Sequence, residues 1–325
     1  MFKPVWGIIG IGWIGQEMAA ALQKAGKTIE AACSRHQEKT EAFCQQYGVA
    51  KAYTDYRDLL ANPKINIVYI ATPHSNHYEV MKEALLAGKN VFCEKAITVN
   101  SDQLEECVAI AKEKNLAIMD GVTLFHMPLY SLLKNDVLPT LGKIKMIQVN
   151  FGSLKDPNPA NRFYSMDLAG GALLDIGVYA ISFARTFMNG DPDVMLTTME
   201  RFQTGVDESS GILLKNKEGE IATISLTFRA KQPKRGMVAG ENGYFEVYNF
   251  PRANQAVLTD PQGQTKTIEA GNSEDALLYE LEAMEKYAAD PKTCQTNLDL
   301  IRSVMKIMTD VRKQWNLVYP FEDKD

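Results

Sequence analysis

The first third of the chain repeats one pattern, in which a short apolar run, a turn and an amphipathic stretch follow one another. Apolar or β-branched runs predict strands, and apolar residues three and four positions apart predict helices. The expected strands are Val5–Ile9, Ile29–Cys33, Ile65–Ala71, Asn90–Cys93 and Leu116–Met119. The expected helices are Gln16–Lys24, Glu38–Tyr47, Tyr56–Leu60, one capped by Ser75 that runs to Gly88, and Ser101–Lys114. This alternation predicts an α/β Rossmann domain with a doubly wound parallel sheet over residues 1–122.

The pattern changes after residue 122, where several runs alternate with period two and a Lys217-Glu218-Gly219 turn predicts a hairpin. The strands expected there are Lys143–Phe151, Val194–Phe202, Ile212–Lys215, Glu220–Arg229, Met237–Ala239 and Tyr244–Phe250. The helices expected there are Gly170–Met188, Asp275–Ala289 and Asn297–Trp315. Residues 123–325 therefore form an α+β substrate and oligomerisation domain with a large, mainly antiparallel open sheet. The helix at 297–315 is a candidate to pack back on the first domain.

An antiparallel sheet with helices on one face leaves its other face in need of cover. Phe228, Tyr244 and Phe245 lie on candidate strands of this sheet. We therefore expect a homodimer or homotetramer built through the C-terminal sheet.

Composition narrows the classes of partner and compartment. The 325 residues are 46% hydrophobic and 23% charged with a net charge of −5, which is typical of a globular protein and gives no basic footprint for nucleic acid. No apolar run reaches the length of a membrane span. The stretch from Pro4 to Gly15 mimics a signal peptide, but its glycines and the Gln16-Glu17 pair argue against cleavage. Five scattered cysteines without a CxxC pair favour a reducing, cytoplasmic location.

A glycine motif follows the first strand and precedes the first helix. Gly10, Gly12 and Gly15 form G-x-G-x-x-G around Trp13 and Ile14. In a dinucleotide-binding turn the first glycine permits the tight turn, the second admits the pyrophosphate and the third allows close helix–strand packing. The alternative is a glycine-rich turn that only packs, but the strand–turn–helix context favours a nicotinamide cofactor.

The end of the second strand bears on the choice between NAD and NADP. An acidic residue there binds the ribose 2′-hydroxyl, whereas this chain has Ser34 and Arg35, which suit a 2′-phosphate. NADP is therefore favoured over NAD. The alternative is that Arg35 is a solvated loop cation and that either cofactor is used.

Three further segments carry candidate chemistry. The fourth strand is followed by Thr72, Pro73, His74 and His77, and the fifth by Glu94 and Lys95, all at the carboxyl edge where such sheets bind ligands. In the second domain Asp175 and Tyr179 are four residues apart and would share one helix face, so polar groups could converge between the domains. With four histidines and no nearby carboxylate or thiol motif, we predict no metal site. His126 is interpreted as structural.

Together the fingerprint, the ATPHxxH segment, the Glu-Lys segment, the GGALLDIGVY segment and the C-terminal helices resemble the Gfo/Idh/MocA family of NAD(P)-dependent oxidoreductases. The resemblance covers essentially the whole chain and implies a sugar, polyol or cyclic diol substrate. It implies that Lys95 contacts cofactor and substrate, that Glu94 supports the cofactor site, and that residues 72, 73, 74 and 77 line the nicotinamide end. Arg162 is a candidate to reach the cofactor or the substrate.

Two positions separate this chain from the common family pattern. Tyr179 replaces a frequent histidine, which resembles the dihydrodiol dehydrogenase and glucose-fructose oxidoreductase branch, where a tyrosine is the acid/base. The hydroxyl of a free tyrosine has a pKa of about 10, and a neighbouring ammonium such as that of Lys95 lowers this pKa. Ala96 stands where the family has proline, and alanine neither fixes φ nor favours a cis bond, so the local turn could differ.

Other functions remain open at this point. The resemblance also admits an NAD-dependent glycosidase that works through transient oxidation, and a non-catalytic dinucleotide-binding sensor. Lys95, Asp175 and Tyr179 are all present, which favours a catalyst over a sensor. Substrate identity, reaction direction and the choice between dimer and tetramer do not follow from the sequence.

Overall fold

The computed structural model describes residues 2–322, and the chain divides into two compact units. The first consists of Met1–Gly121 and Leu277–Arg302, and the second of Val122–Ala276 and Ser303–Asp325. Leu277–Arg302, which lies within the range expected for the second domain, thus groups with the first unit. None of the helices within residues 2–322 is long and apolar enough to cross a membrane.

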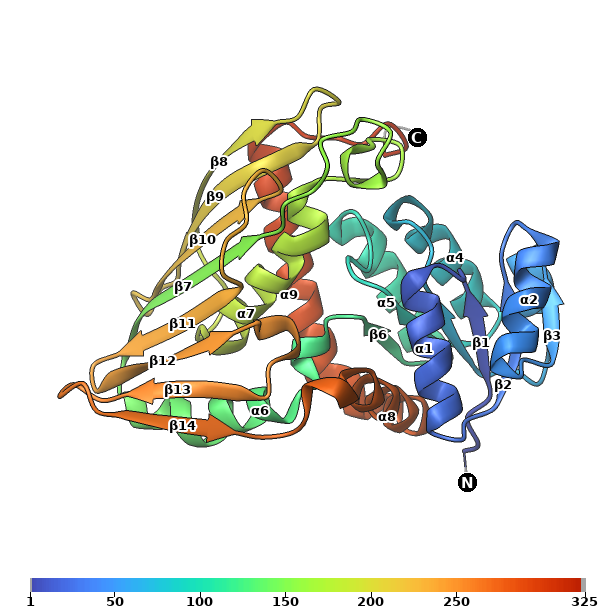
Figure 1. Cartoon of the computed structure of the whole chain (residues 1–325), viewed down its shortest axis with the longest axis horizontal. Helices are drawn as coiled ribbons and strands as arrows, with labels where there is room; N and C mark the ends of the chain where they lie inside the picture. Colours follow the sequence, from blue (N-terminus) through green and yellow to red (C-terminus); the bar gives the residue numbers. More distant parts are fainter. Residues whose placement is uncertain (1, 323–325) are drawn as a thin grey trace. The chain divides into compact units, whose positions relative to one another are not determined.

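The first unit contains a parallel six-stranded sheet in the order β3-β2-β1-β4-β5-β6, flanked by helices (Figure 1). Its strands are β1 (Trp6–Ile9), β2 (Ile29–Cys33), β3 (Lys51–Tyr53), β4 (Ile67–Ile70), β5 (Asn90–Cys93) and β6 (Ile118–Asp120). Its helices are α1 (Trp13–Lys24), α2 (Gln37–Tyr47), α3 (Tyr56–Leu60), α4 (His74–Leu86), α5 (Ser101–Lys114) and α8 (Ala276–Ala289). This strand order confirms the doubly wound Rossmann fold and places the ends of β1 and β4 side by side.

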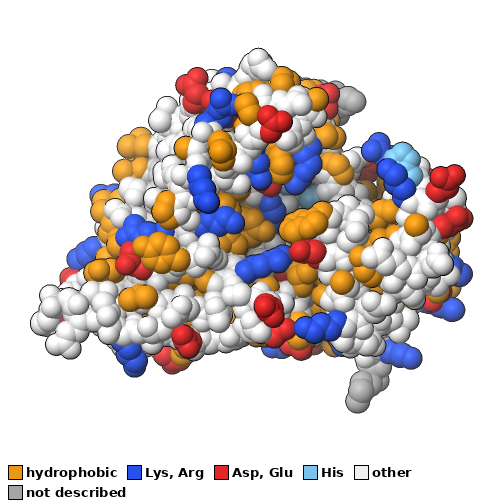
Figure 2. All heavy atoms as spheres, viewed as in Figure 1, with side chains coloured by type: hydrophobic (Ala, Val, Ile, Leu, Met, Phe, Trp, Pro, Cys, Tyr) orange, Lys and Arg blue, Asp and Glu red, His pale blue; other side chains and the backbone are white. Residues whose placement is uncertain are grey.

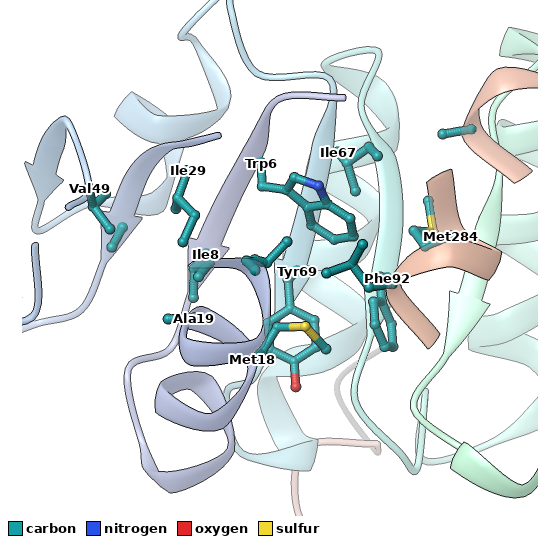
Figure 3. Packing of buried hydrophobic residues seen from close by; sticks show 14 of the residues in the cluster. Trp6, Ile8, Met18, Ala19, Ile29, Val49, Ile67, Tyr69, Phe92 and Met284 are labelled. Carbon is teal, nitrogen blue, oxygen red and sulfur yellow. The ribbon is translucent and has the colours of Figure 1, made fainter. Parts of the chain in front are cut away.

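The core of the first unit lies between this sheet and helices α1, α2 and α8 (Figure 3). Trp6 on β1 and Tyr69 on β4 are fully buried there beside Met18 of α1. Glu285 of α8 is held by both Trp6 Nε1, at 3.3 Å, and Lys27 Nζ, at 2.5 Å. A segment from near the end of the chain therefore completes the core of the Rossmann unit.

The second unit contains an eight-stranded sheet in the order β14-β13-β12-β11-β7-β10-β9-β8, in which only the β7–β10 pair is parallel. Its strands are β7 (Ile144–Gly152), β8 (Val194–Arg201), β9 (Asp207–Lys215), β10 (Ile221–Thr227), β11 (Arg235–Gly240), β12 (Gly243–Tyr248), β13 (Gln255–Thr259) and β14 (Thr265–Glu269). The predicted mainly antiparallel open sheet is confirmed. Strands β3, β13 and β14 were not expected.

Helices cover one face of this sheet (Figure 1). They include α6 (Pro128–Leu132), α7 (Val178–Phe187) and the later part of α9 (Gln295–Gln314), with π-helical segments at Leu133–Val137 and Leu173–Gly177. Short 3-10 turns lie at Thr123–Phe125, Leu138–Leu141, Arg162–Tyr164, Phe250–Arg252, Ser273–Asp275 and Pro291–Cys294. Phe187 of α7 packs at 5.0 Å against Phe245 of β12, which fixes α7 on the sheet.

Three expectations are wrong in detail. The single helix at 170–188 is a π-helical segment followed by α7, because hydrogen bonds spaced five residues apart admit an extra residue in the turn. Phe228 and Phe245 are fully buried inside the unit and do not lie on its open face. Ser75 is not a cap, because α4 begins at His74 directly after Pro73.

Candidate functional site

The glycines of the fingerprint have three different environments. Gly10 has φ +98°, and a Cβ there would lie 2.5 Å from the carbonyl oxygen of Ala71. A Cβ on Gly15 would lie 2.2 Å from the carbonyl oxygen of Gly10, so any side chain would push α1 away from the turn. A Cβ on Gly12, by contrast, would meet nothing within 4 Å. The turn is therefore tight on the protein side and open in front of the helix, as a pyrophosphate requires.

The start of α1 presents the rest of the fingerprint to this open space. Gly12 is the N-cap of α1 and supplies no capping side chain, so the first N–H groups of the helix are available to an anion. Trp13 is 72% exposed at the first position, and Ile14 beside it is partly buried. The chain's own residues thus fit a dinucleotide.

The turn after β2 carries the residues expected to choose the cofactor. Ser34 Oγ hydrogen-bonds with Thr40 Oγ1 at 2.7 Å, which ties the turn to α2. Arg35 is exposed and forms no ion pair with any residue from 2 to 322. Burial together with Asp55 and Asp58 raises the pKa of Cys33 to about 12, so this strand end adds no negative charge.

The segments after β4 and β5 are joined by two histidines. His74 Nε2 lies 3.1 Å from the carbonyl oxygen of Lys95, and the ring nitrogens of His77 lie 2.8 Å from the carbonyl oxygens of Ala96 and Thr72. His77 is fully buried, and burial lowers the pKa of its ring. Its contribution to the site is to hold these two segments.

The Lys95 segment is positioned by buried contacts. The Lys95–Ala96 peptide bond is cis, although alanine replaces the expected proline. Glu94 is buried and accepts a hydrogen bond from Tyr69 Oη, and a Cβ on Gly121 would lie 2.9 Å from its Oε2. Lys95 is partly exposed at the carboxyl end of β5. Thr72 and Pro73 follow the neighbouring strand β4. The residues expected at the cofactor after β4 and β5 therefore lie at the same edge of the sheet.

In the second unit Asp175 and Tyr179 lie on either side of the junction between the π-helical segment and α7. Asp175 is 8% exposed, whereas Tyr179 is partly exposed with its ring 6.3 Å from that of Phe151 at the end of β7. The π turn changes the angular spacing of the two residues from the α-helical spacing that the sequence predicted. Single π turns of this kind occur often at functional sites.

Two glycines bring the Arg162 turn against the start of this helical segment. A Cβ on Gly170 would lie 2.7 Å from the carbonyl oxygen of Phe163, and Gly171 N–H donates to the same oxygen at 2.9 Å. Arg162 itself is exposed, with its guanidinium 4.2 Å from the centre of the Phe163 ring. Arg162 therefore belongs to the same neighbourhood as Asp175 and Tyr179.

Asp207 at the start of β9 is a residue that sequence reasoning missed. Its Oδ2 accepts the N–H of Leu173 at 2.7 Å and thereby caps the helical segment that carries Asp175. Oδ1 makes no hydrogen bond within residues 2–322, and a Cβ on Gly171 would lie 2.2 Å from it. Complete burial raises the pKa of Asp207 to about 6, against the pull of Arg312 and the backbone N–H groups. We expected this strand to begin at Ile212, but β9 begins at Asp207, and the added residues supply the carboxylate that caps the helical segment.

The C-terminal residues support the same turn. Tyr319 is fully buried and donates to the carbonyl oxygen of Gly170 at 2.6 Å. Arg312 makes a bidentate ion pair with Glu322, with both N···O distances 2.7 Å; Arg312 is buried and Glu322 is partly buried. This pair holds the tail that carries Tyr319.

Neither a group of metal-binding side chains nor His126 forms a second site in the described part of the chain. In the part of the chain from 2 to 322, no three His, Cys, Asp or Glu side chains are arranged to hold a metal ion. Burial lowers the pKa of His126 to about 4, so it is neutral at neutral pH.

Comparison with known proteins identifies this arrangement. Residues 5–122 match an oxidoreductase family with an NAD-binding Rossmann fold, and residues 139–246 match the GFO/IDH/MocA C-terminal domain. The chain belongs to the GFO/IDH/MocA family. It is therefore an NAD(P)-dependent dehydrogenase or reductase, as the sequence predicted.

The chain is similar along most of its length to trans-1,2-dihydrobenzene-1,2-diol dehydrogenases. The Xenopus laevis enzyme is 30% identical over 260 residues, covering 78% of each chain, and the human enzyme is 29% identical over 249 residues, covering 75% and 74%. Among solved structures, the 3-ketoreductase KijD10 of Actinomadura kijaniata, in complex with NADP and TDP-benzene, has a TM-score of 0.87 at 22% identity and covers 96% of this chain and 98% of its own. This last likeness establishes the shared fold.

Proposed function

We propose that this GFO/IDH/MocA protein transfers hydride between NADP and a CH–OH carbon of a sugar, polyol or cyclic diol. The observation that carries the proposal is Tyr179, which keeps its ring partly exposed where the capped π-helical segment joins α7. The diol dehydrogenases related to this chain support a vicinal diol or sugar as substrate. Both catalytic directions use the same groups.

When bound, the nicotinamide supplies or accepts the hydride. In the oxidative direction Tyr179 takes the proton of the substrate hydroxyl as general base. The Lys95 ammonium stabilises the negative charge that develops on the substrate oxygen. Asp175 orients the substrate or the Tyr179 hydroxyl. Glu94, His74 and His77 hold the Lys95 segment in place through the contacts described above.

The preference for NADP rests on Arg35, the unpaired cation at the end of β2, together with the absence of an acid there. Replacing Arg35 with aspartate is expected to raise the dissociation constant for NADPH roughly 10- to 100-fold, the worth of charge-assisted hydrogen bonds to a phosphate. NADH, which lacks the phosphate, should bind the variant at least as tightly as it binds the native protein. Titration of each cofactor while following tryptophan fluorescence measures both constants.

The fluorescence signal can be assigned to one residue. Trp6 and Trp315 are buried, whereas Trp13 is 72% exposed at the start of α1, so Trp13 should dominate the quenching. A Trp13→Phe control should lose most of the signal. Native protein that binds neither cofactor would contradict the proposal, and equal NADPH affinity in the Arg35→Asp variant would contradict the role of Arg35.

We further propose a homodimer or homotetramer built through the open face of the second unit's sheet. A row of apolar side chains crosses four neighbouring strands on this face, each residue opposite the next: Ile221, Met146, Ala239 and Tyr244. Leu196 on β8 is 62% exposed opposite Leu213 on β9, and hydrophobic side chains are visible at the surface along this edge (Figure 2). An apolar face of this kind favours association.

Leu196→Glu is expected to shift the assembly toward monomer and to raise its dissociation constant at least about 100-fold, because association would bury an unpaired charge. Sedimentation over a range of protein concentrations measures the change. Leu86→Glu on α4 is a matched control, since Leu86 is also exposed, at 52%, but lies in the first unit. Equal effects of the two substitutions would exclude this face as the interface.

The proposed location is the cytoplasm. All five cysteines, Cys33, Cys44, Cys93, Cys107 and Cys294, are buried free thiols. Burial also raises the pKa of each of these thiols, which keeps them unreactive. Free thiols support a reducing compartment.

A further inference from the structure

Basic side chains gather near the ends of strands β7 and β10, beside Phe151, whose ring contacts Tyr179. Strands β7 and β10 run parallel and end together at Gly152 and Thr227. Beyond them Lys155 N–H donates to the carbonyl oxygen of Phe228 at 2.9 Å, which keeps the two continuing segments side by side. The segment after β7, the turn before the π-helical segment and the β10–β11 loop supply these cations: Lys155, Arg162, Arg229, Lys231 and Lys234. Lys and Arg side chains are visible on this face of the second unit (Figure 2).

Aromatic rings hold three of these cations in place. Lys155 Nζ lies 4.0 Å from the centre of the Phe163 ring, and the Arg162 guanidinium lies 4.2 Å from the same centre. Lys234 Nζ lies 5.1 Å from the centre of the Phe151 ring. Such contacts orient a cation without cancelling its charge.

These rings connect the cations to the reacting group. The Phe151 ring under Lys234 is the one that lies 6.3 Å from the Tyr179 ring. The carbonyl oxygen of Phe163 accepts the Gly171 N–H at the start of the segment that leads to Tyr179. Lys234 is therefore linked to Tyr179 through Phe151, and Lys155 and Arg162 are linked through Phe163 to the start of the segment that leads to Tyr179.

Several of these cations have no ion-pair partner among residues 2–322. Arg229 pairs with Glu208 at 3.5 Å, but Arg162, Lys231 and Lys234 form no ion pair within the described residues. Because Lys155 and Arg162 share one ring, their charges lie within about 8 Å of each other and repel. A fold that holds like charges together in this way is relieved by a bound anion.

We propose that the substrate carries a phosphoryl group, which Lys155, Arg162 and Lys234 bind while Tyr179 serves the reacting hydroxyl. This inference rests on the proposed function and names the substrate class as a phosphorylated sugar or polyol. A phosphoryl group has a charge of about −2 and therefore balances the charge of several cations better than a single carboxylate does. Its oxygens accept hydrogen bonds from both Lys and Arg. Arg162 is thereby assigned to the substrate.

The test measures anion binding without requiring turnover. The full-length protein is first saturated with NADP, which occupies the Gly10–Gly15 turn, and inorganic pyrophosphate is then titrated by calorimetry. Lys234→Met and Arg162→Met are each expected to weaken pyrophosphate binding at least about 10-fold, as the loss of one charge-assisted contact predicts. Both side chains are exposed, so the variants should keep the native melting temperature.

Lys217→Met is the matched control, because Lys217 is an exposed lysine in the β9–β10 hairpin turn. Pyrophosphate binding that is absent, or that responds equally to all three substitutions, would overturn the proposal. Glucuronate that binds more tightly than pyrophosphate would overturn the choice of a phosphoryl group over a carboxylate. Cofactor binding, followed separately through Trp13, shows whether the oxidoreductase proposal itself has failed.

Discussion

Tyr179→Phe is expected to lower kcat by about 10²- to 10⁴-fold, the range lost when a general acid–base is removed. Phenylalanine keeps the ring, including its packing 6.3 Å from Phe151, and removes only the hydroxyl. The dissociation constant for NADPH should stay within about twofold of the native value, because the fingerprint glycines and Trp13 belong to the other unit. Steady-state kinetics on a panel of sugars, sugar phosphates and cyclic diols, with the Trp13 titration alongside, measures both quantities.

A second tyrosine gives the matched control for this experiment. Tyr248 is 52% exposed at the end of β12, and Tyr248→Phe should leave kcat unchanged. Turnover by the Tyr179→Phe variant close to that of the native protein would remove Tyr179 from the chemistry. A fall in kcat accompanied by an equal loss of NADPH affinity would indicate a general structural defect and would also contradict the assigned role.

The Rossmann unit was predictable because its signals are local. Each buried strand is a short, mainly apolar run, and Ile29–Cys33 and Asn90–Cys93 have the bounds that the pattern gave. The glycine fingerprint is equally local, since the turn, the open approach and the helix packing all lie within six residues. The helix α8 was expected at Asp275–Ala289, but its place in this core was not, because it packs there from a position far along the chain.

The second unit was harder to predict because its strands depend on distant neighbours. The start of β9 at Asp207 is a polar run, Asp-Glu-Ser-Ser-Gly, and it becomes a strand only because β8 and β10 pair with it. Phe228 and Phe245 have the hydrophobicity of interface residues, but both are buried: Phe245 through its register on β12, and Phe228 in the bend directly after β10. An isolated apolar run does not show which face of the sheet its side chains occupy, because a one-residue change of register moves each of them to the opposite face.

The site residues divide in the same way. Gly10 and Gly15 were found by spacing and Glu94 through the family resemblance, and each has a steric or hydrogen-bonding reason in the structure. His77 was expected at the nicotinamide end, and its ring nitrogens also contact backbone carbonyl oxygens of the segments after β4 and β5, which the motif spacing does not predict. Asp207 has no motif, since a cap supplied from another strand leaves no fixed spacing in the sequence.

Asp207 gives a large expected effect of pH on stability. Its pKa is raised from 3.8 to about 6, so the folded protein binds more protons than the unfolded chain between these two values. Stability from this group is therefore fully present below pH 3.8 and is lost as the pH rises through about 6. The loss amounts to about 3 kcal/mol of unfolding free energy.

Asp207→Asn removes the charge and keeps an oxygen that can accept the Leu173 N–H. The native protein should therefore lose about 2 kcal/mol relative to this variant between pH 4 and pH 7, because the rest of the change falls outside this interval; urea unfolding at intervals of pH measures the loss. Other titrating groups cancel in that difference, because they are common to both proteins.

Asp136→Asn, at an exposed carboxylate of the same unit, controls for loss of a surface charge. A difference between native protein and Asp207→Asn that stays constant with pH would show that the Asp207 carboxyl is already ionised at pH 4. The helical segment that carries Asp175 would then be capped by a carboxylate over the whole range.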